Sequence, residues 1–300
     1  LKITPEIVTG VQEFDQSIKG RVGELYAIIQ ANTDPQAVAA ALIDPARLKP
    51  LLGALAPRFD VDALAEGSSS SDLLLERASR GAGSGSVLVV DRQTAGRGRR
   101  GRLWQSSPAA SLTFSVLWRF DGGVERLAGL SLAVGVALAR ALSSLGVAGA
   151  RLKWPNDVLL DSRKLAGILV ELSSERRGIV AVIGIGLNLA LPETEAPLDV
   201  APAALAEALP KVPDRHLLLA TILAELAPVL DRFAAEGFAA LRDDWQALHV
   251  WQGHPVNVLR DGCVEMSGRC LGADIDGALL IDTTHGIERC LSGDLSLREA

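Results

Sequence analysis

A short basic loop between two apolar runs is the feature that most restricts how this chain can fold. The runs at 86–90 and 111–118 are of the kind that forms buried strands. Glycine lets a backbone approach a ligand closely, and guanidinium groups bind carboxylate or phosphate oxygens two at a time. The loop therefore predicts a site for a small anion that carries both kinds of group. Its arginines and glycines are Arg92, Arg97, Arg99, Arg100, Arg102, Gly96, Gly98 and Gly101.

An arginine run taken alone also fits a solvated face or a nucleic-acid surface. A second pair of motifs favours the small-molecule site. Lys-Trp-Pro-Asn-Asp stands at 153–157, and Arg-Lys-Leu-Ala-Gly follows at 163–167. Together with the arginine loop, these motifs resemble those of the biotin protein ligases, and the resemblance runs from about residue 68 to the C-terminus.

The resemblance implies an α+β fold of the class II synthetase-like, biotin/lipoyl ligase type. Its catalytic domain is a mixed β-sheet flanked by helices, and a small C-terminal β-barrel follows. The residue patterns agree. Ala and Leu at 129–145 predict a helix that backs the sheet, and 214–232 and 234–247 predict amphipathic helices. The runs 152–154, 157–160 and 164–171, with a turn at 161–163, predict a hairpin whose strands bring Asp157 and Lys164 to the same end.

The composition changes near Trp251, which marks a domain boundary. Beyond it, short β-type runs separated by Asp-Gly and His-Gly turns predict a small antiparallel barrel, and Ser-Leu-Arg at 296–298 is similar to the end of the family's own barrel. We expect three parts: an N-terminal segment at 1–67, a catalytic domain at 68–250 and a C-terminal barrel at 251–300.

The N-terminal segment 1–67 shows apolar spacing typical of short helices. Some biotin ligases carry a DNA-binding winged helix there. This segment lacks the pattern of a basic recognition helix, so we expect either a degenerate winged-helix remnant or an unrelated leader, and no DNA binding. Its cations are Lys2, Lys19, Arg21, Arg47, Lys49 and Arg58.

Composition excludes several other classes. The net charge of −6 argues against a constitutive nucleic-acid binder. The absence of a signal-peptide pattern and of a long uncharged apolar run predicts a cytoplasmic protein that is not in a membrane. The four histidines are scattered, and the spacing of Cys263, Cys270 and Cys290 fits no zinc pattern, so we expect no metal ligands in the protein.

The chemistry that the resemblance implies is a two-step ligation. Biotin attacks the α-phosphate of ATP to give biotinyl-5'-AMP and pyrophosphate, and a lysine of a biotin carboxyl carrier protein then takes the biotin. Mg²⁺ would shield the leaving pyrophosphate. The expected small molecules are biotin, ATP and Mg²⁺, and the expected partner is the carrier domain. The oligomeric state stays open, with a homodimer as one candidate.

The biotin site is assigned by matching the family's motifs. The family's Ser-Thr-Asn corresponds to Ser69-Ser70-Ser71, whose hydroxyls would bind the ureido ring, although a hydroxyl run before an apolar segment is also an ordinary helix N-cap. The glutamine before the loop and the loop itself would enclose the acid. The expected biotin-binding residues are Ser69, Ser70, Gln93, Arg97, Gly98, Arg99 and Lys164.

Lys164 lies between a turn and the apolar run 165–170, so part of its stem must be buried and its ammonium needs an anion. The family's matching lysine contacts the biotin carboxylate and the α-phosphate. We expect catalysis from Lys164, Arg99 and Asp157, where Asp157 either holds Lys164 or assists deprotonation of the incoming lysine. The expected ATP-binding residues are Arg97, Arg100, Trp104, Lys153, Asn156 and Asn188.

Two of these assignments rest on further observations. The ring of Trp104 fits either a lid on the core or a surface that packs on the ligand. Gly184 and Gly186 alternate within an apolar strand, which marks the close approach of a backbone or ligand, and the family's Gly-x-Gly-x-Asn pattern then ends at Asn188.

Three other functions compete with the ligase hypothesis. A lipoate ligase shares the fold and the adenylation chemistry. A biotin-sensing repressor would add DNA binding to the ligase. A nucleic-acid binder would use the arginines on one exposed face and ignore ATP.

Overall fold

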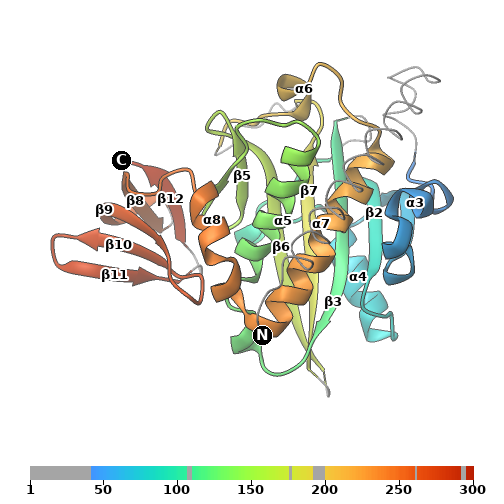
Figure 1. Cartoon of the computed structure of the whole chain (residues 1–300), viewed down its shortest axis with the longest axis horizontal. Coiled ribbons are helices and arrows are strands. Elements are labelled where there is room, and N and C mark those ends of the chain that lie inside the picture. The colour runs from blue at the N-terminus through green and yellow to red at the C-terminus, as the bar shows by residue number, and fades with distance from the viewer. Residues whose placement is uncertain (1–41, 107–109, 176–177, 192–199, 261, 292–294) are drawn as a thin grey trace, which may run out of the picture.

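The computed structural model describes residues 42–106, 110–175, 178–191, 200–260, 262–291 and 295–300. They form a seven-stranded mixed sheet with helices on both faces and a five-stranded antiparallel sheet at the C-terminus (Figure 1). The expected α+β fold is confirmed. The expected winged-helix remnant falls largely on residues 1–41, which lie outside the described residues.

The main sheet has the strand order β1-β2-β3-β7-β6-β5-β4. β1 and β2 run parallel, and every other neighbouring pair is antiparallel. The strands are β1 (Asp60–Gly67), β2 (Ser86–Gln93), β3 (Ser111–Phe120), β4 (Arg151–Lys153), β5 (Asp157–Leu160), β6 (Arg163–Glu175) and β7 (Gly178–Asn188).

Side chains that alternate along the central strands serve two cores. On β3, Phe114, Val116 and Trp118 point into the large core under α5 and α7, whereas Leu117 packs in a smaller cluster under α4. The helices are α3 (Pro45–Leu52), α4 (Ser70–Ser79), α5 (Leu130–Ser144), α6 (Leu205–Ala208), α7 (Arg215–Glu236) and α8 (Arg242–Leu248). Short 3-10 turns are η1 (Gly53–Arg58), η2 (Arg99–Gly101), η3 (Val124–Leu127) and η4 (Phe238–Leu241).

The long apolar helix was predicted at 129–145, and α5 confirms it. The stretch Val124–Ser144 is apolar and long enough to cross a membrane by composition alone, but most of it is buried in the core, which accounts for its composition. The last two predicted helices, 214–232 and 234–247, have other bounds in the structure: the first is the longer α7, and the second is the shorter α8. α7 continues to Glu236 and ends at Gly237, which adopts a positive φ of 73° and donates its N–H to Phe233.

The described residues before 68, which begin at 42, belong structurally to the main sheet and its core. β1 is its edge strand, paired with β2, and α3 packs against α7, with the guanidinium of Arg47 3.2 Å from the carboxylate of Asp214. The division at residue 68 remains a prediction about domains. We now propose that the catalytic unit begins near Ile43, which is buried in the same core.

The C-terminal sheet has the order β11-β10-β9-β8-β12 and is open. In the described part of the chain no ladder joins its edge strands, so the expected closed barrel is corrected to an open sheet. The physical reason is that its apolar face, including Val256, Cys270 and Leu297, belongs to the same core as the catalytic domain. The strands are β8 (Pro255–Arg260), β9 (Cys263–Ala273), β10 (Leu279–Thr283), β11 (Gly286–Cys290) and β12 (Leu295–Glu299).

The C-terminal sheet is docked on the catalytic domain by hydrogen bonds at buried positions. The indole N–H of Trp154 donates to the carbonyl of Gly277 at 3.2 Å, and Nε of Arg242 donates to the carbonyl of Ala273 at 2.8 Å. Because Trp154 stands next to Lys153, this docking brings the second sheet to the edge of the basic motifs.

Candidate active site

A cavity of about 650 Å³ opens between the arginine loop, the start of α4, strands β5 to β7 and strand β12. The structure brings the residues predicted from sequence together here from separate segments of the chain. All thirteen line the cavity: Ser69, Ser70, Gln93, Arg97, Gly98, Arg99, Arg100, Trp104, Lys153, Asn156, Asp157, Lys164 and Asn188. Their individual roles stay predictions.

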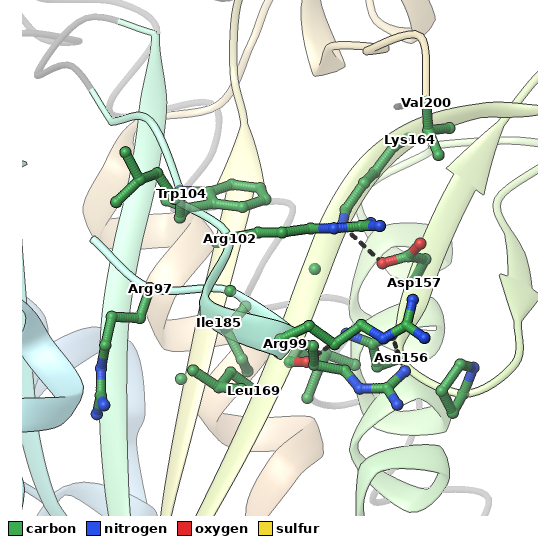
Figure 2. Close-up of a pocket in the computed structure, with 18 of the residues that line it drawn as sticks. Arg97, Arg99, Arg102, Trp104, Asn156, Asp157, Lys164, Leu169, Ile185 and Val200 are labelled. Carbon is green, nitrogen blue, oxygen red and sulfur yellow. Dashed lines mark hydrogen bonds and ion pairs between the residues drawn. The ribbon is translucent and has the colours of Figure 1, made fainter. Parts of the chain in front are cut away.

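Two lysines share one carboxylate at the centre of the cavity. The ammonium of Lys164 lies 2.7 Å from Oδ1 of Asp157 (Figure 2). The ammonium of Lys153 lies 3.7 Å from Oδ2 of the same carboxylate. A hairpin turn at Asp161 and Ser162, both with positive φ, folds β6 back on β5. The predicted approach of Asp157 to Lys164 is confirmed.

The cluster keeps a net positive charge. Burial acts to raise the pKa of Asp157, but the adjacent Lys164 and Lys153 outweigh it and lower that pKa, so the carboxylate stays ionised. Burial lowers the pKa of Lys153 to about 8, although Asp157 opposes this shift; Arg298 and Lys164 lower it further. Two cations against one anion leave charge that an anionic substrate can neutralise.

The arginine loop forms a compact turn above this cluster. The backbone N–H of Gly98 donates to the carbonyl of Arg102 at 2.7 Å, and the backbone N–H of Trp104 donates to the carbonyl of Gly96 at 2.9 Å. The guanidinium of Arg99 donates to the side-chain carbonyl of Asn156 at 3.3 Å. Figure 2 shows Arg102 extending toward Lys164 and Asp157. The loop therefore adds guanidinium groups to the same side of the cavity as the lysines.

Arg97 points elsewhere. Its Nη2 lies 2.6 Å from Oε1 of Glu171 and 2.5 Å from Oδ1 of Asp72, and in Figure 2 it is directed away from Lys164. Burial raises the pKa of Glu171, with Arg97 opposing the shift. Arg97 lines the cavity, but in this arrangement its guanidinium ties the loop to α4 and β6. Its expected contact with biotin and ATP stays a prediction.

Trp104 lies on the floor of the cavity, over β6 and β7. A Cβ built on Gly186 would stand 2.3 Å from Cε2 of the ring, and one on Gly167 would stand 3.2 Å from Cζ3. The ammonium of Lys164 is 5.7 Å from the ring centroid. The prediction that Gly186 marks a close approach is confirmed, and the approaching group is the indole.

Hydroxyls at the start of α4 line another part of the cavity. Ser69 caps the helix, and its Oγ accepts from the N–H of Asp72 at 3.5 Å. Ser70 and Ser71 are buried, and the N–H of Ser70 donates to Oε1 of Gln93 at 2.7 Å. These contacts fix α4 to the end of β2, where the arginine loop begins.

Asn188 has a backbone role in this arrangement. Its Nδ2 donates to the carbonyls of Lys164 at 3.2 Å and Ala203 at 3.0 Å. The N–H of Lys164 also donates to Ala201 at 2.8 Å. Asn188 thus holds the segment at 200–203 against β6, and its expected contact with ATP stays a prediction.

Several lining residues were not assigned from the sequence. Arg102 and Arg298 are cations, and Ser296 comes with Arg298 from β12. The arginine count of the loop was the available signal for Arg102. The Ser-Leu-Arg run was the signal for β12, but only the docking of the second sheet shows that it reaches the cavity.

Comparison with known proteins places the chain in a family. The model of the biotin/lipoate A/B protein ligase family matches residues 67–188. The bifunctional ligase/repressor BirA of Escherichia coli (strain K12) is 39% identical over 219 residues, which are 72% of this chain and 68% of that protein. The biotin--[acetyl-CoA-carboxylase] ligase of Mycobacterium tuberculosis is 35% identical over 239 residues, 77% of this chain and 86% of that protein.

A solved structure agrees with these relatives. The biotin protein ligase from Aquifex aeolicus in complex with biotin and ATP superposes with a TM-score of 0.69 at 31% identity, over 80% of this chain and 99% of that one. The chain therefore belongs to the biotin/lipoate A/B protein ligase family, in its biotin protein ligase branch. It is an enzyme of the ligase class, as the motifs predicted.

Proposed function

We propose that this protein activates biotin with ATP and transfers it to a lysine of a carrier protein. A carboxylate oxygen of biotin attacks the α-phosphorus, a new P–O bond forms, and the bond to pyrophosphate breaks. The ε-amine of the acceptor lysine then attacks the acyl carbon, an amide forms, and AMP leaves with the electron pair. The observation that carries this proposal is one cavity with a cationic centre and a hydroxyl-lined part.

The cationic centre suits the first step. Biotin carboxylate and the ATP phosphates are both negative and repel each other, so the site must offset that repulsion while it aligns them. Lys164 and Lys153 supply the charge, and Asp157 fixes the ammonium of Lys164 in place. Arg99 approaches from the loop and is suited to hold the adenylate after pyrophosphate leaves.

Magnesium fits as a companion of ATP rather than as a resident ion. In the described part of the chain no group of three or more His, Cys, Asp or Glu side chains could hold a metal. Among the described residues that line the cavity, Asp157 is the one carboxylate, and two lysines already bind it. We therefore propose that Mg²⁺ would be held by the ATP phosphates and not by protein side chains, where it would supply positive charge beside the pyrophosphate group.

The acceptor is a biotin carboxyl carrier domain, and relatives named biotin--[acetyl-CoA-carboxylase] ligase support this partner. We propose a cytoplasmic enzyme. We expect no DNA binding because the sequence at 1–67 shows no basic pattern of a recognition helix, although the Escherichia coli relative is named as a ligase and repressor. A homodimer stays a candidate arrangement.

Pyrophosphate release on mixing the protein with Mg-ATP tests the first step, with biotin, with lipoate and with no acid. We expect release that depends on biotin. Lipoate at equal or higher kcat/KM would instead assign the protein to the lipoate-type ligases, which share the family. A folded sample that releases pyrophosphate with neither acid would overturn the proposal.

A further inference from the structure

A buried serine below the cavity contacts both hydroxyls at the start of α4. Ser115 lies in the middle of β3 and has no exposed surface. Its Oγ is 2.8 Å from Oγ of Ser70 and 3.0 Å from Oγ of Ser71. Ser70 and Ser71 line the cavity, and Ser115 does not. We call Ser70, Ser71 and Ser115 the serine cluster.

The surroundings leave room for the cluster. Opposite Ser115 on β7 stands Gly184, where a Cβ would come within 2.8 Å of Oγ of Ser71 and 3.5 Å of Oγ of Ser115. The neighbours on the same face are apolar, including Leu88 and Leu117. A serine in such a strand is isolated from water, so its hydroxyl must find its partners within the cluster.

The number of protons in the serine cluster decides which hydroxyl donates and which accepts in each hydrogen bond. Each hydroxyl has one proton and can also accept. If Ser70 and Ser71 both donated to Ser115, the proton of Ser115 would be buried without an acceptor, which costs free energy. The favoured arrangement has Ser115 donate to one of them and accept from the other. One cavity serine then keeps its proton for a ligand, and the other offers lone pairs.

This pattern matches one class of ring. A cyclic urea presents a carbonyl acceptor flanked by N–H donors, so it pairs with a donor and an acceptor held side by side. The dithiolane ring of lipoate has neither an N–H nor a carbonyl. A donor and an acceptor left unpaired against such a ring would discriminate against it.

We propose that Ser115 is a positioning residue for specificity: it orients the hydroxyls of Ser70 and Ser71 so that the cavity selects acids carrying a cyclic urea. This inference rests on the proposed function, and it assigns the choice between acids to a residue that touches neither substrate. Gln93, which accepts from the N–H of Ser70, holds the backbone in register for the same contact.

Ser115→Ala tests the proposal. We expect KM for biotin, and also for desthiobiotin, which keeps the cyclic urea, to rise about tenfold. We expect kcat and KM for ATP to stay within about twofold, because Ser115 acts through Ser70 and Ser71 and not through Lys164, Lys153 or Arg99. The kcat/KM ratio of biotin to lipoate should fall by a similar factor. Ser86→Ala, which removes another buried serine hydroxyl from the neighbouring strand, is the matched control.

A coupling measurement separates positioning from a structural defect. In a protein that already carries Ser70→Ala and Ser71→Ala, adding Ser115→Ala should change the dissociation constant of biotin by less than about twofold, since nothing remains to orient. Additive losses, or parallel losses in kcat and in KM for ATP, would overturn the inference. If Ser115→Ala does not fold, Ser115→Cys keeps the volume with a weak donor and is read in the same way.

The wild-type protein separates this inference from the proposed function. If wild type binds biotin in calorimetry but releases no pyrophosphate, the catalytic proposal fails while the effect of Ser115→Ala on biotin binding still decides the inference. If wild type is active with biotin and Ser115→Ala leaves the dissociation constant of biotin unchanged, the inference alone fails.

Discussion

The residues at the centre of the cavity do different work although several carry the same charge. Lys164 is paired at 2.7 Å with a buried carboxylate, so its ammonium is fixed, whereas Arg99 reaches Asn156 from a loop. A fixed cation suits the stabilisation of charge in a transition state, and a loop cation suits the retention of an intermediate.

Lys164→Ala should lower the rate of biotinyl-5'-AMP synthesis by about 100-fold to 1000-fold, because one fixed donor to the reacting phosphate is lost. Arg99→Ala should instead raise the dissociation rate of the adenylate by about tenfold and change its synthesis much less. Single-turnover synthesis and a chase with unlabelled biotin measure the two steps. Arg151→Ala, an exposed cation on β4, controls for loss of charge. Equal loss of both steps in both variants would contradict this division.

Lys153 predicts a pH dependence. Burial lowers its pKa to about 8, well below the usual 10.5, so the free enzyme loses this charge as the pH rises through about 8. The buried charge of Lys153 lowers the free energy of unfolding below pH 8. This cost is relieved as the pH rises from 8 to 10.5, because over that range the folded protein loses the proton and the unfolded chain keeps it. We expect kcat/KM for ATP to fall above pH 8. Lys153→Met should have a low kcat/KM for ATP at every pH. If kcat/KM for ATP in that variant still fell above pH 8, Lys153 would not be the group responsible.

The sequence identified the charged residues because they stand in short, spaced motifs. It did not identify Ser115 as part of the site, since a serine in an apolar strand has no local signature and its partners are 44 and 45 residues away. The sequence also did not predict that the side chain of Arg97 points to Glu171, because that partner is 74 residues away along the chain.

At the scale of elements, the arginine loop depends on the strands beneath it. Trp104 anchors the C-terminal end of the loop, and its ring rests on β7 only because position 186 has no side chain. The glycine spacing could be recognised from the sequence, but the identity of the group above it required the pairing of β3, β6 and β7.

Gly186→Ala should displace the ring of Trp104, because the new Cβ would stand 2.3 Å from Cε2. The loop then loses its support, and we expect KM for ATP to rise about tenfold and the loop to be cut faster by trypsin. Gly135→Ala on α5, where the nearest atom is at an ordinary 3.4 Å, is the control. An unchanged KM and an unchanged digestion rate would show that the indole does not support the loop.

At the scale of the whole molecule, the second sheet completes the cavity. Its short antiparallel strands followed from the turn dipeptides, whereas their order in the sheet and its open form did not. Whether edge strands pair depends on where the apolar face finds cover, and here that face joins the core of the catalytic domain. The contribution of β12 to the site follows from this docking.

His249 makes the docking sensitive to acid. It is buried between the carbonyl of Leu152 and Sγ of Cys270, and burial lowers its pKa to about 4. In the unfolded chain His249 is protonated below about pH 6.5, whereas in the folded protein it stays neutral down to about pH 4. The free energy of unfolding therefore falls as the pH drops from 6.5 toward 4, by up to about 1.4 kcal/mol per pH unit. Denaturant unfolding against pH measures this slope. His249→Gln should flatten it, and an equal slope in that variant would rule out His249 as its source.

The most direct test of the account is transfer of biotin to a carrier lysine. A purified biotin carboxyl carrier domain is mixed with the protein, Mg-ATP and biotin, and its intact mass is followed. We expect the mass of one biotinyl group on one lysine, no addition when that lysine is replaced by arginine, and very slow addition with Lys164→Ala. Biotinylation that proceeds at the wild-type rate with Lys164→Ala, or none at all with the folded wild-type protein and an intact carrier, would contradict the account.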